Sequence, residues 1–289
     1  MSKLYVVPTP IGNLGDITER AIETLMESDL ILAEDTRHTQ RLLNAFDIKT
    51  RLISYHKFNE KSRSEEIVNE IIAENKTVSL VTDAGTPCIS DPGYELVKSA
   101  REAGIEVVGL AGASAVTVAL SVSGIDTGKF AFYGFLPRKK SEIEAELKKI
   151  KENPIRTFVL YESPKRIINL IEAIEEAMPN AVICVCKELT KLHERTFYGT
   201  VDSVLQQLNS HSDAERGEYV VVGYNNDYEE QEHDNTKTGI HGVLFDKLIS
   251  KGHSLKEAVK EAVEEGAASK NDAYKASLEI KKFFEEYNL

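Results

Sequence analysis

The stretch "SLVTDAGTPCISDPG", residues 79–93, places two carboxylates, Asp83 and Asp91, among glycines, prolines and small polar residues. A short apolar run leads into it, so we expect the loop to follow a buried strand. Small residues let a ligand approach the backbone, whose N–H and C=O groups can then bind it. The residue types therefore predict a ligand-binding loop at the end of a strand.

Three other loops share this character: "PTPIGNLGD", "EDTRHTQ" and "AGASA". Loops at the carboxyl ends of parallel strands meet at one edge of a sheet, where ligands bind. The carboxylates, which include Glu34 and Asp35, stand beside the apolar "CIS" segment. This combination favours a ligand with an amine or sulfonium charge and a flat nucleoside, such as S-adenosylmethionine. Tight turns without a ligand are the alternative interpretation.

The sequence lacks the motifs of several other classes of enzyme. The sequence contains no G-x-x-x-x-G-K-[ST] loop, no G-x-G-x-x-G after the first apolar run and no G-x-S-x-G elbow. The seven histidines are scattered without ligand spacing, so we predict no metal site. Asp83 at a strand end would suit an aspartyl phosphotransferase, but the adjacent aspartate that would hold magnesium is missing.

The elements that must position these loops follow a simple order. Strand-like runs alternate with helical patterns through residues 1–124, which predicts an α/β domain with a mostly parallel sheet. The first helical pattern carries apolar residues at helical spacing, and Asp16 is its expected N-cap. "GIDTGK" is the expected boundary.

Residues 125–226 predict a second α/β domain, in which antiparallel pairing is favoured. "DYEEQEHDNTKTG", residues 227–239, has the composition of an exposed linker. Residues 237–289 predict three short amphipathic helices that resemble a helix-turn-helix module in outline. The fold class is therefore α/β, with two α/β domains and a small C-terminal helical module.

Composition limits the class of protein. No apolar run reaches the length of about 18 residues that a membrane span needs, and the N-terminal apolar run is too short for a secretory signal. The cysteines Cys88, Cys184 and Cys186 are expected to be reduced thiols in a cytoplasmic protein.

The net charge of −12 argues against a nucleic-acid partner for the molecule as a whole, but the charge is unevenly distributed along the chain. Basic residues outnumber acidic ones in residues 126–200, where they cluster in "PRKKS", "ESPKR" and "KELTKLHER". These clusters are either solvated surface charges or a local face for RNA.

The loops and clusters occur in an order that resembles a known family. "VVPTPIGNLGDIT", "AEDTRHTQRLL", "SLVTDAGTPCISDPG", "AGASAVTVALSVSG", "GFLPRK", "YESPKR" and "KELTKLHER" are similar to the bacterial ribosomal small-subunit RNA ribose methyltransferases called RsmI. That family belongs to the tetrapyrrole-methylase-like enzymes. The resemblance implies S-adenosylmethionine in a cleft between two α/β domains. It also implies 2′-O-methylation of a decoding-centre cytidine, cytidine 1402, in 16S rRNA.

The resemblance carries site residues with it. It implies that the cofactor contacts Pro10, Gly12, Asp83, Ala84, Gly85, Ile89, Ser90, Gly112, Ser114, Ala115, Phe135 and Leu136. Ala111 departs from the pattern, since proline is expected before the "GxSA" turn. The partner implied is 16S rRNA in the small ribosomal subunit, and a homodimer is expected.

A ribose hydroxyl must lose its proton during methylation, and Asp35, Glu162 and Lys187 are the candidate acceptors. For each of them a salt bridge or a helix cap is the alternative role. Phosphates of the RNA would be held by Arg37, Arg138, Lys139, Lys165, Arg166 and Arg195. Two other functions stay open: methylation of a tetrapyrrole-like small molecule, and RNA binding without catalysis.

Overall fold

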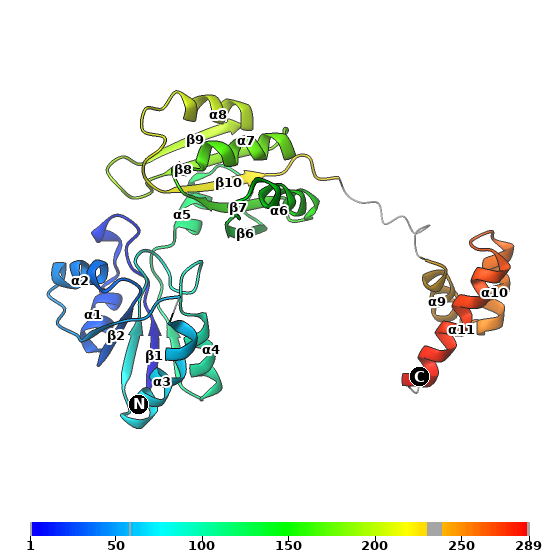
Figure 1. Cartoon of the computed structure of the whole chain (residues 1–289), viewed down its shortest axis with the longest axis horizontal. Helices are drawn as coiled ribbons and strands as arrows, with labels where there is room; N and C mark the ends of the chain where they lie inside the picture. Colours follow the sequence, from blue (N-terminus) through cyan, green and yellow to red (C-terminus); the bar gives the residue numbers. More distant parts are fainter. Residues whose placement is uncertain (1, 58, 230–238, 288–289) are drawn as a thin grey trace. The chain divides into compact units, whose positions relative to one another are not determined.

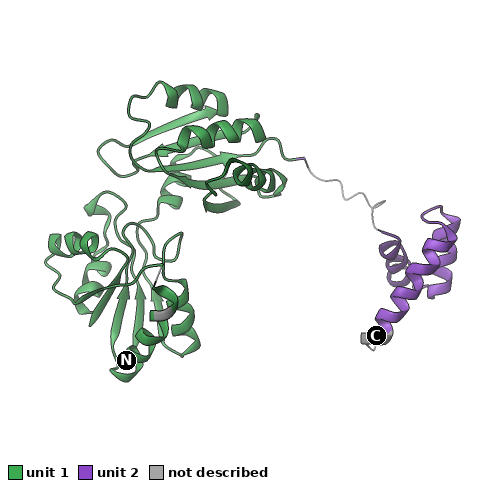
Figure 2. Ribbon diagram, viewed as in Figure 1, with its two compact units in different colours: residues 1–228 green, residues 229–289 purple. Residues whose placement is uncertain are grey.

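The computed structural model describes residues 2–57, 59–229 and 239–287. The chain forms two compact units, residues 1–228 and 229–289 (Figure 2). The first unit holds two β-sheets, and the second holds three helices. The domain limits expected at residues 124 and 226 remain predictions. Most of the linker expected over residues 227–239 lies outside the described residues.

The first sheet has five parallel strands in the order β3-β2-β4-β1-β5. The strands are β1 (Lys3–Val6), β2 (Leu30–Ala33), β3 (Leu52–Ser54), β4 (Thr77–Leu80) and β5 (Glu106–Gly109). Parallel neighbours need a crossover between them, and the helices of the alternating pattern supply it. The predicted parallel sheet is confirmed.

Helices cover both faces of this sheet. α1 (Glu19–Glu27) and α2 (Thr36–Ala45) share an apolar core with one face, and α3 (Glu60–Ala73) and α4 (Tyr94–Glu102) share one with the other. Figure 1 labels β1 and β2 of this sheet and the helices α1–α4 that lie around it. The N-cap prediction for α1 is wrong. Asp16 belongs to a 3-10 turn, η1 (Leu14–Asp16), so the helix starts later and Thr18 Oγ1 accepts from the Ala21 N–H.

The second sheet is mixed, in the order β6-β7-β10-β8-β9. β6 and β7 pair in parallel and the other neighbours are antiparallel, as favoured by the sequence. The strands are β6 (Phe130–Phe135), β7 (Thr157–Glu162), β8 (Val182–Lys187), β9 (Arg195–Thr200) and β10 (Tyr219–Tyr224). Cys184 and Cys186 lie in β8, and the three cysteines of the described chain are free thiols.

Helices α6 (Lys140–Glu152), α7 (Ile167–Ala177) and α8 (Val201–Asn209) pack on one face of the second sheet. The helix α8 was not predicted from the sequence, although its buried residues Val201, Val204 and Leu208 have helical spacing. Thr200 ends β9 and caps the helix, since its Oγ1 accepts from the Ser203 N–H.

The opposite face of the second sheet is covered by α5 (Ala115–Val122), which follows the last strand of the first sheet. Val116, Ala119 and Leu120 of this helix pack against β7, β8 and β10. The loop before α5 is thereby held between the carboxyl edge of the first sheet and the second sheet.

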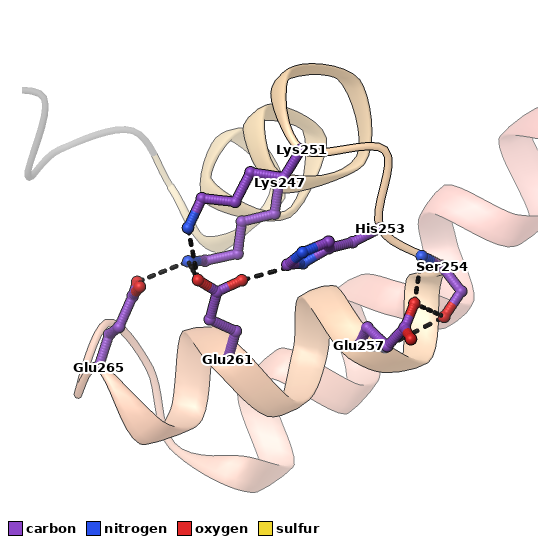
Figure 3. A network of polar contacts seen from close by, with 7 residues as sticks. All are labelled: Lys247, Lys251, His253, Ser254, Glu257, Glu261 and Glu265. Atoms are coloured by element: carbon purple, nitrogen blue, oxygen red, sulfur yellow. Dashed lines mark hydrogen bonds and ion pairs between the residues drawn. The ribbon is translucent and has the colours of Figure 1, made fainter.

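The C-terminal unit consists of α9 (Ile240–Ser250), α10 (Leu255–Glu264) and α11 (Lys270–Tyr287), as predicted. Leu244, Ala258, Ala262, Ala276 and Ile280 form its core. Figure 3 shows the polar network that joins α9 to α10, in which the Lys247 ammonium lies 2.6 Å from Glu265 Oε2. Among the described helices of the whole chain, none has the length and apolar character needed to cross a membrane.

Candidate active site

A cavity of about 460 Å³ opens at the carboxyl edge of the first sheet, and we call it the first cavity. One wall comes from the loops after β1, β2 and β4 and from the start of α5. The other wall comes from the ends of β6 and β7, the loop after β8 and the start of β10. Because β10 is antiparallel to β7 and β8, its first residues lie at the same end of the second sheet as the last residues of those strands.

Short hydrogen bonds hold the loop at residues 81–93 in shape. Thr9 and Gly85 exchange two backbone hydrogen bonds of 2.9 and 3.0 Å, and Thr86 Oγ1 donates to Ala113 O at 3.1 Å. Cys88 and Ser90 have φ values of 72° and 67°, which are costly for residues other than glycine. The protein therefore maintains a strained loop shape at the cavity wall.

Most of the predicted cofactor residues meet in the first cavity. Those that line it are Asp83, Ala84, Gly85, Ile89, Ser90, Ser114, Ala115 and Phe135. Pro10 and Gly12 line a neighbouring cavity instead. Gly112 packs on Pro8, so that an added Cβ would lie 2.6 Å from Pro8 Cβ, and Leu136 is buried in the core of the second sheet.

Sequence reasoning missed part of the lining. Tyr161 and Val220 contribute from the second sheet, and Leu189 contributes from the loop after β8. The rings of Tyr161 and Phe135 lie 5.5 Å apart between centroids, which gives the cavity an aromatic wall suited to a flat ring. Tyr161 stands next to the quoted "ESPKR" motif, but its neighbours across the strands could not be read from the sequence.

The first cavity is acidic. Glu34, Asp83 and Asp91 all line it, and burial raises the pKa of Asp91 to about 7, with the nearby Glu34 adding to the effect. Burial also raises the pKa of Glu34, whose Oε2 accepts from Thr82 Oγ1 at 3.1 Å. The described residues that line this cavity include no lysine or arginine. A cationic ligand would therefore reduce the electrostatic repulsion among the carboxylates of Glu34, Asp83 and Asp91.

Of the three candidate proton acceptors, Asp35 serves as a helix cap. Its Oδ1 accepts from the Arg37 N–H at 2.8 Å, and its Oδ2 accepts from Arg37 Nη2 at 2.7 Å. These bonds from Arg37 hold the pKa of the Asp35 carboxyl far below its usual range. Asp35 is not among the residues that line the first cavity.

Glu162 and Lys187 belong to one cross-strand row with Tyr219, because Tyr219 pairs with Glu162 on β7 and with Lys187 on β8. Residues in such a row share a face of the sheet, and Tyr219 belongs to the core beneath α6–α8. Glu162 Oε2 accepts from Arg166 Nη2 at 2.5 Å. Lys187 Nζ donates to Asp213 O at 2.6 Å. Glu162 lines the first cavity, whereas Lys187 does not.

The structure separates the predicted RNA-binding residues into two kinds. Those with exposed side chains are Arg37, Arg138, Lys139, Lys165 and Arg195. Arg166 is held by Glu162 and by Leu136 O, to which Nη2 donates at 3.1 Å. Among the exposed residues, Arg37 pairs with Asp35 and Lys139 with Glu142, whereas the structure gives Arg138, Lys165 and Arg195 no ion pair among the described residues.

Comparison with known proteins connects this geometry to a family. Residues 3–205 match the model of the Tetrapyrrole (Corrin/Porphyrin) Methylases. A ribosomal RNA small subunit methyltransferase I from Bacillus subtilis (strain 168) is 42% identical over 278 residues, which cover 96% of this chain and 94% of that relative. The chain belongs to the ribosomal RNA small subunit methyltransferase I family. A Thermotoga maritima relative of the same name is 46% identical over 224 residues, covering 77% of this chain and 98% of its own.

Solved structures agree with this family at the level of the fold. The methyltransferase CobJ has a TM-score of 0.56 at 18% identity and covers 78% of this chain and 95% of its own. Diphthine synthase has a TM-score of 0.57 at 16% identity, with coverages of 76% and 89%. The predicted family, the fold class and the assignment as a methyltransferase are confirmed by these findings.

Proposed function

We propose that the protein transfers the methyl group of S-adenosylmethionine to the 2′-hydroxyl of cytidine 1402 in 16S rRNA. The observation that supports this best is the first cavity, which is acidic, backbone-lined and walled by aromatic rings, in a chain of the ribosomal RNA small subunit methyltransferase I family. The name of the relatives indicates small-subunit rRNA as the substrate. The choice of cytidine 1402 and of its 2′-oxygen comes from the motif resemblance.

The lining of the first cavity fits S-adenosylmethionine. Tyr161 and Phe135 offer a face for the adenine, and Ile11, Ile89 and Leu189 offer apolar contact. When bound, the cofactor would supply a methyl group already activated by its sulfonium, and the electron pair of the S–C bond would stay on the sulfur as the acceptor oxygen takes the methyl.

The protein's own contribution is to hold the acceptor in line, exclude water and receive the proton. Asp35, Glu162 and Lys187 remain predicted proton acceptors. The contacts described above also give each of them a structural role, as helix cap, ion-pair partner and buried ammonium.

The exposed basic residues support an RNA substrate. Arg138 and Lys139 precede α6, Lys165 precedes α7, and Arg195 begins β9, so they flank the same end of the second sheet as the first cavity. Phosphate contacts of this kind make binding weaken as salt concentration rises. We further propose that the protein acts as a homodimer in the cytoplasm. Size-exclusion chromatography with light scattering would test the oligomeric state.

The decisive experiment incubates the protein with S-adenosylmethionine and small ribosomal subunits that lack the modification. Mass spectrometry of the rRNA nucleosides should then show a gain of 2′-O-methylcytidine, located at cytidine 1402 by nuclease mapping. A parallel reaction with S-adenosylhomocysteine in place of the cofactor is the control. Absence of a new methyl group on rRNA, with calorimetric binding of S-adenosylmethionine intact, would favour a small-molecule substrate. Absence of both would favour RNA binding without catalysis.

A further inference from the structure

A second cavity of about 330 Å³ adjoins the first. Ile11, Asp83, Ala84 and Glu218 line both cavities, so these residues form the wall between them. The rest of the second cavity comes from the loop after β1, from α2 and from Lys191 in the loop after β8. Its volume lies within the range of small-ligand pockets, which starts at about 300 Å³.

Thr39 of α2 is one of the residues that line the second cavity. Its side chain is 2% exposed, and Thr39 Oγ1 makes no hydrogen bond within the described part of the chain. Thr9 and Thr82 also line this cavity, but Thr9 Oγ1 donates to Thr82 O and Thr82 Oγ1 donates to Glu34 Oε2. A buried hydroxyl without a partner is costly, and a rotation of the Thr39 side chain that turns Oγ1 toward the second cavity would let a polar group of a ligand satisfy it.

The charges of the second cavity differ from those of the first. His38 and Arg41 lie one turn apart on α2, and Arg41 is exposed, with no ion pair among the residues that the structure describes. Lys191 is already neutralised by Glu188 and Glu218 at 2.8 and 2.7 Å. Arg41 is therefore the cation available for an anionic group such as a phosphate.

Asp83 stands at the wall between the cavities. Its Oδ1 accepts from the Asp35 N–H at 3.0 Å, which orients the carboxylate. No hydrogen bond to Asp83 Oδ2 is found in the described residues, so this oxygen is available to a ligand. A hydroxyl of a ligand in the second cavity that pointed toward the first cavity would meet the Asp83 carboxylate, because Asp83 lines both cavities.

We propose that the second cavity receives the ribonucleotide to be methylated, with Thr39 and Arg41 holding it. Asp83 Oδ2, in place of the acceptors predicted from the sequence, takes the proton of the nucleotide's acceptor hydroxyl. This inference rests on the proposed function, because it names the acceptor subsite of that same reaction. Enzymes that act on one nucleotide commonly take it out of its stack into a pocket, and the second cavity has the size and the charge for one such unit.

The first test concerns binding. Thr39→Val and Arg41→Ala should each weaken the affinity for unmodified small subunits about fivefold, measured by filter binding without cofactor. Their calorimetric affinity for S-adenosylmethionine should stay within about twofold of the unchanged protein. Thr39→Ser keeps the hydroxyl and should retain affinity. Arg101→Ala is the matched control, since this exposed arginine lies in the last turn of α4, at the other edge of the sheet.

The second test concerns the proton. Asp83→Asn keeps Oδ1 as an acceptor for the Asp35 N–H but removes the basic oxygen, so kcat should fall about 100-fold. The affinity for small subunits and the thermal unfolding midpoint should stay unchanged, which separates a role in proton transfer from a structural one.

The outcomes distinguish this inference from the proposed function. If the unchanged protein methylates rRNA but Thr39→Val and Arg41→Ala bind small subunits as well as it does, the proposed subsite is wrong and the proposed function still holds. Loss of cofactor affinity in those variants would assign the second cavity to the cofactor and also overturn it. No methylation of rRNA by the unchanged protein would overturn the proposed function, and this inference with it.

Discussion

Asp91 shows how burial converts an ordinary carboxyl into a group that responds to its ligand. It lies in the first cavity with Glu34, Asp83 and the phenol of Tyr161, and its pKa is raised to about 7. A raised carboxyl pKa stabilises the fold below its unfolded value, and this contribution is lost as pH rises through about 7. The protein without ligand should therefore lose stability over this range, and a bound cation should restore it.

This residue makes the affinity for S-adenosylmethionine depend on pH. A sulfonium favours ionised Asp91, so binding should weaken by about fivefold from pH 8 to pH 6, while the neutral thioether S-adenosylhomocysteine changes less. Calorimetry of both ligands in the unchanged protein and in Asp91→Asn measures the difference. Equal pH dependence for both ligands, or an unaltered profile in Asp91→Asn, would contradict the role given to this carboxyl.

Lys165 and Arg166 are neighbours in sequence with different expected roles. Arg166→Ala would leave the Glu162 side chain, which is 2% exposed, without its cation, so the free energy of unfolding should fall by about 2 kcal/mol or more. Lys165 is exposed, and Lys165→Ala should keep the stability within about 0.5 kcal/mol. Urea denaturation compares the two variants.

The same pair tests the RNA face. Lys165→Ala should weaken binding to small subunits and reduce the salt dependence of that binding, because one phosphate contact is lost. If affinity and salt slope both match those of the unchanged protein, Lys165 does not contact RNA. The double variant would not be informative, since it would combine this effect with the loss of the Glu162–Arg166 ion pair.

At the scale of elements, the second sheet depends on close packing in its middle. Gly223 of β10 pairs with Phe158 of β7, and the aromatic ring covers the place where a side chain at position 223 would project. Phe158 is fully buried in the core beneath α6–α8. A central strand therefore carries a glycine because the ring of its neighbour fills the space.

Gly223→Ala should be strongly destabilising, because the added Cβ overlaps a ring that has no room to move. We expect a loss of about 2 kcal/mol or more in the free energy of unfolding, measured by urea denaturation of the full chain. Gly109→Ala in β5 is the control, since no atom lies within 4 Å of an added Cβ there. Equal losses in both variants would show that glycine matters for the strand backbone rather than for the ring.

At the scale of the whole molecule, the C-terminal unit has its own electrostatic stabilisation. Glu261 accepts from Lys251, which holds the pKa of the Glu261 carboxyl at about 2, and Lys247 and His253 also lie close to this carboxylate (Figure 3). A lowered carboxyl pKa stabilises the fold above its unfolded value of about 4.3, and this contribution is lost as pH falls through about 2.

The helices α9 and α10 should therefore lose amide protection between about pH 4.5 and pH 2, before the sheets of the first unit do. Hydrogen exchange of the full chain, corrected for the intrinsic rate at each pH, measures this. Glu261→Gln should flatten the dependence, whereas Glu264→Gln, on an exposed side chain of the same helix, should leave it unchanged. A dependence that survives Glu261→Gln would assign it to other carboxyls.

Sequence patterns were enough to predict most of the elements in their order and the loops that meet at one end of the first sheet. Strand and helix patterns are local, and parallel strands bring the loops that follow them together, so the ligand edge and the contribution of Asp83 to it were predictable. The motif order likewise carried the family. The start of α1 was placed too early, because a 3-10 turn precedes the helix. The whole of α8 was missed although its buried residues have helical spacing.

Only the tertiary structure decided which side chains reach the cavities. Pro10 and Gly12 line the second cavity, Leu136 faces the core, and Tyr161, the first residue of the quoted "YESPKR", supplies a cavity wall that was not predicted for it. Facing depends on strand register, since a shift of one residue turns a side chain to the opposite side of the sheet. Register is fixed by packing between residues that lie far apart in the sequence. The unpartnered hydroxyl of Thr39, on helix α2, could likewise be recognised only in the folded chain, because it depends on which residues pack around that helix.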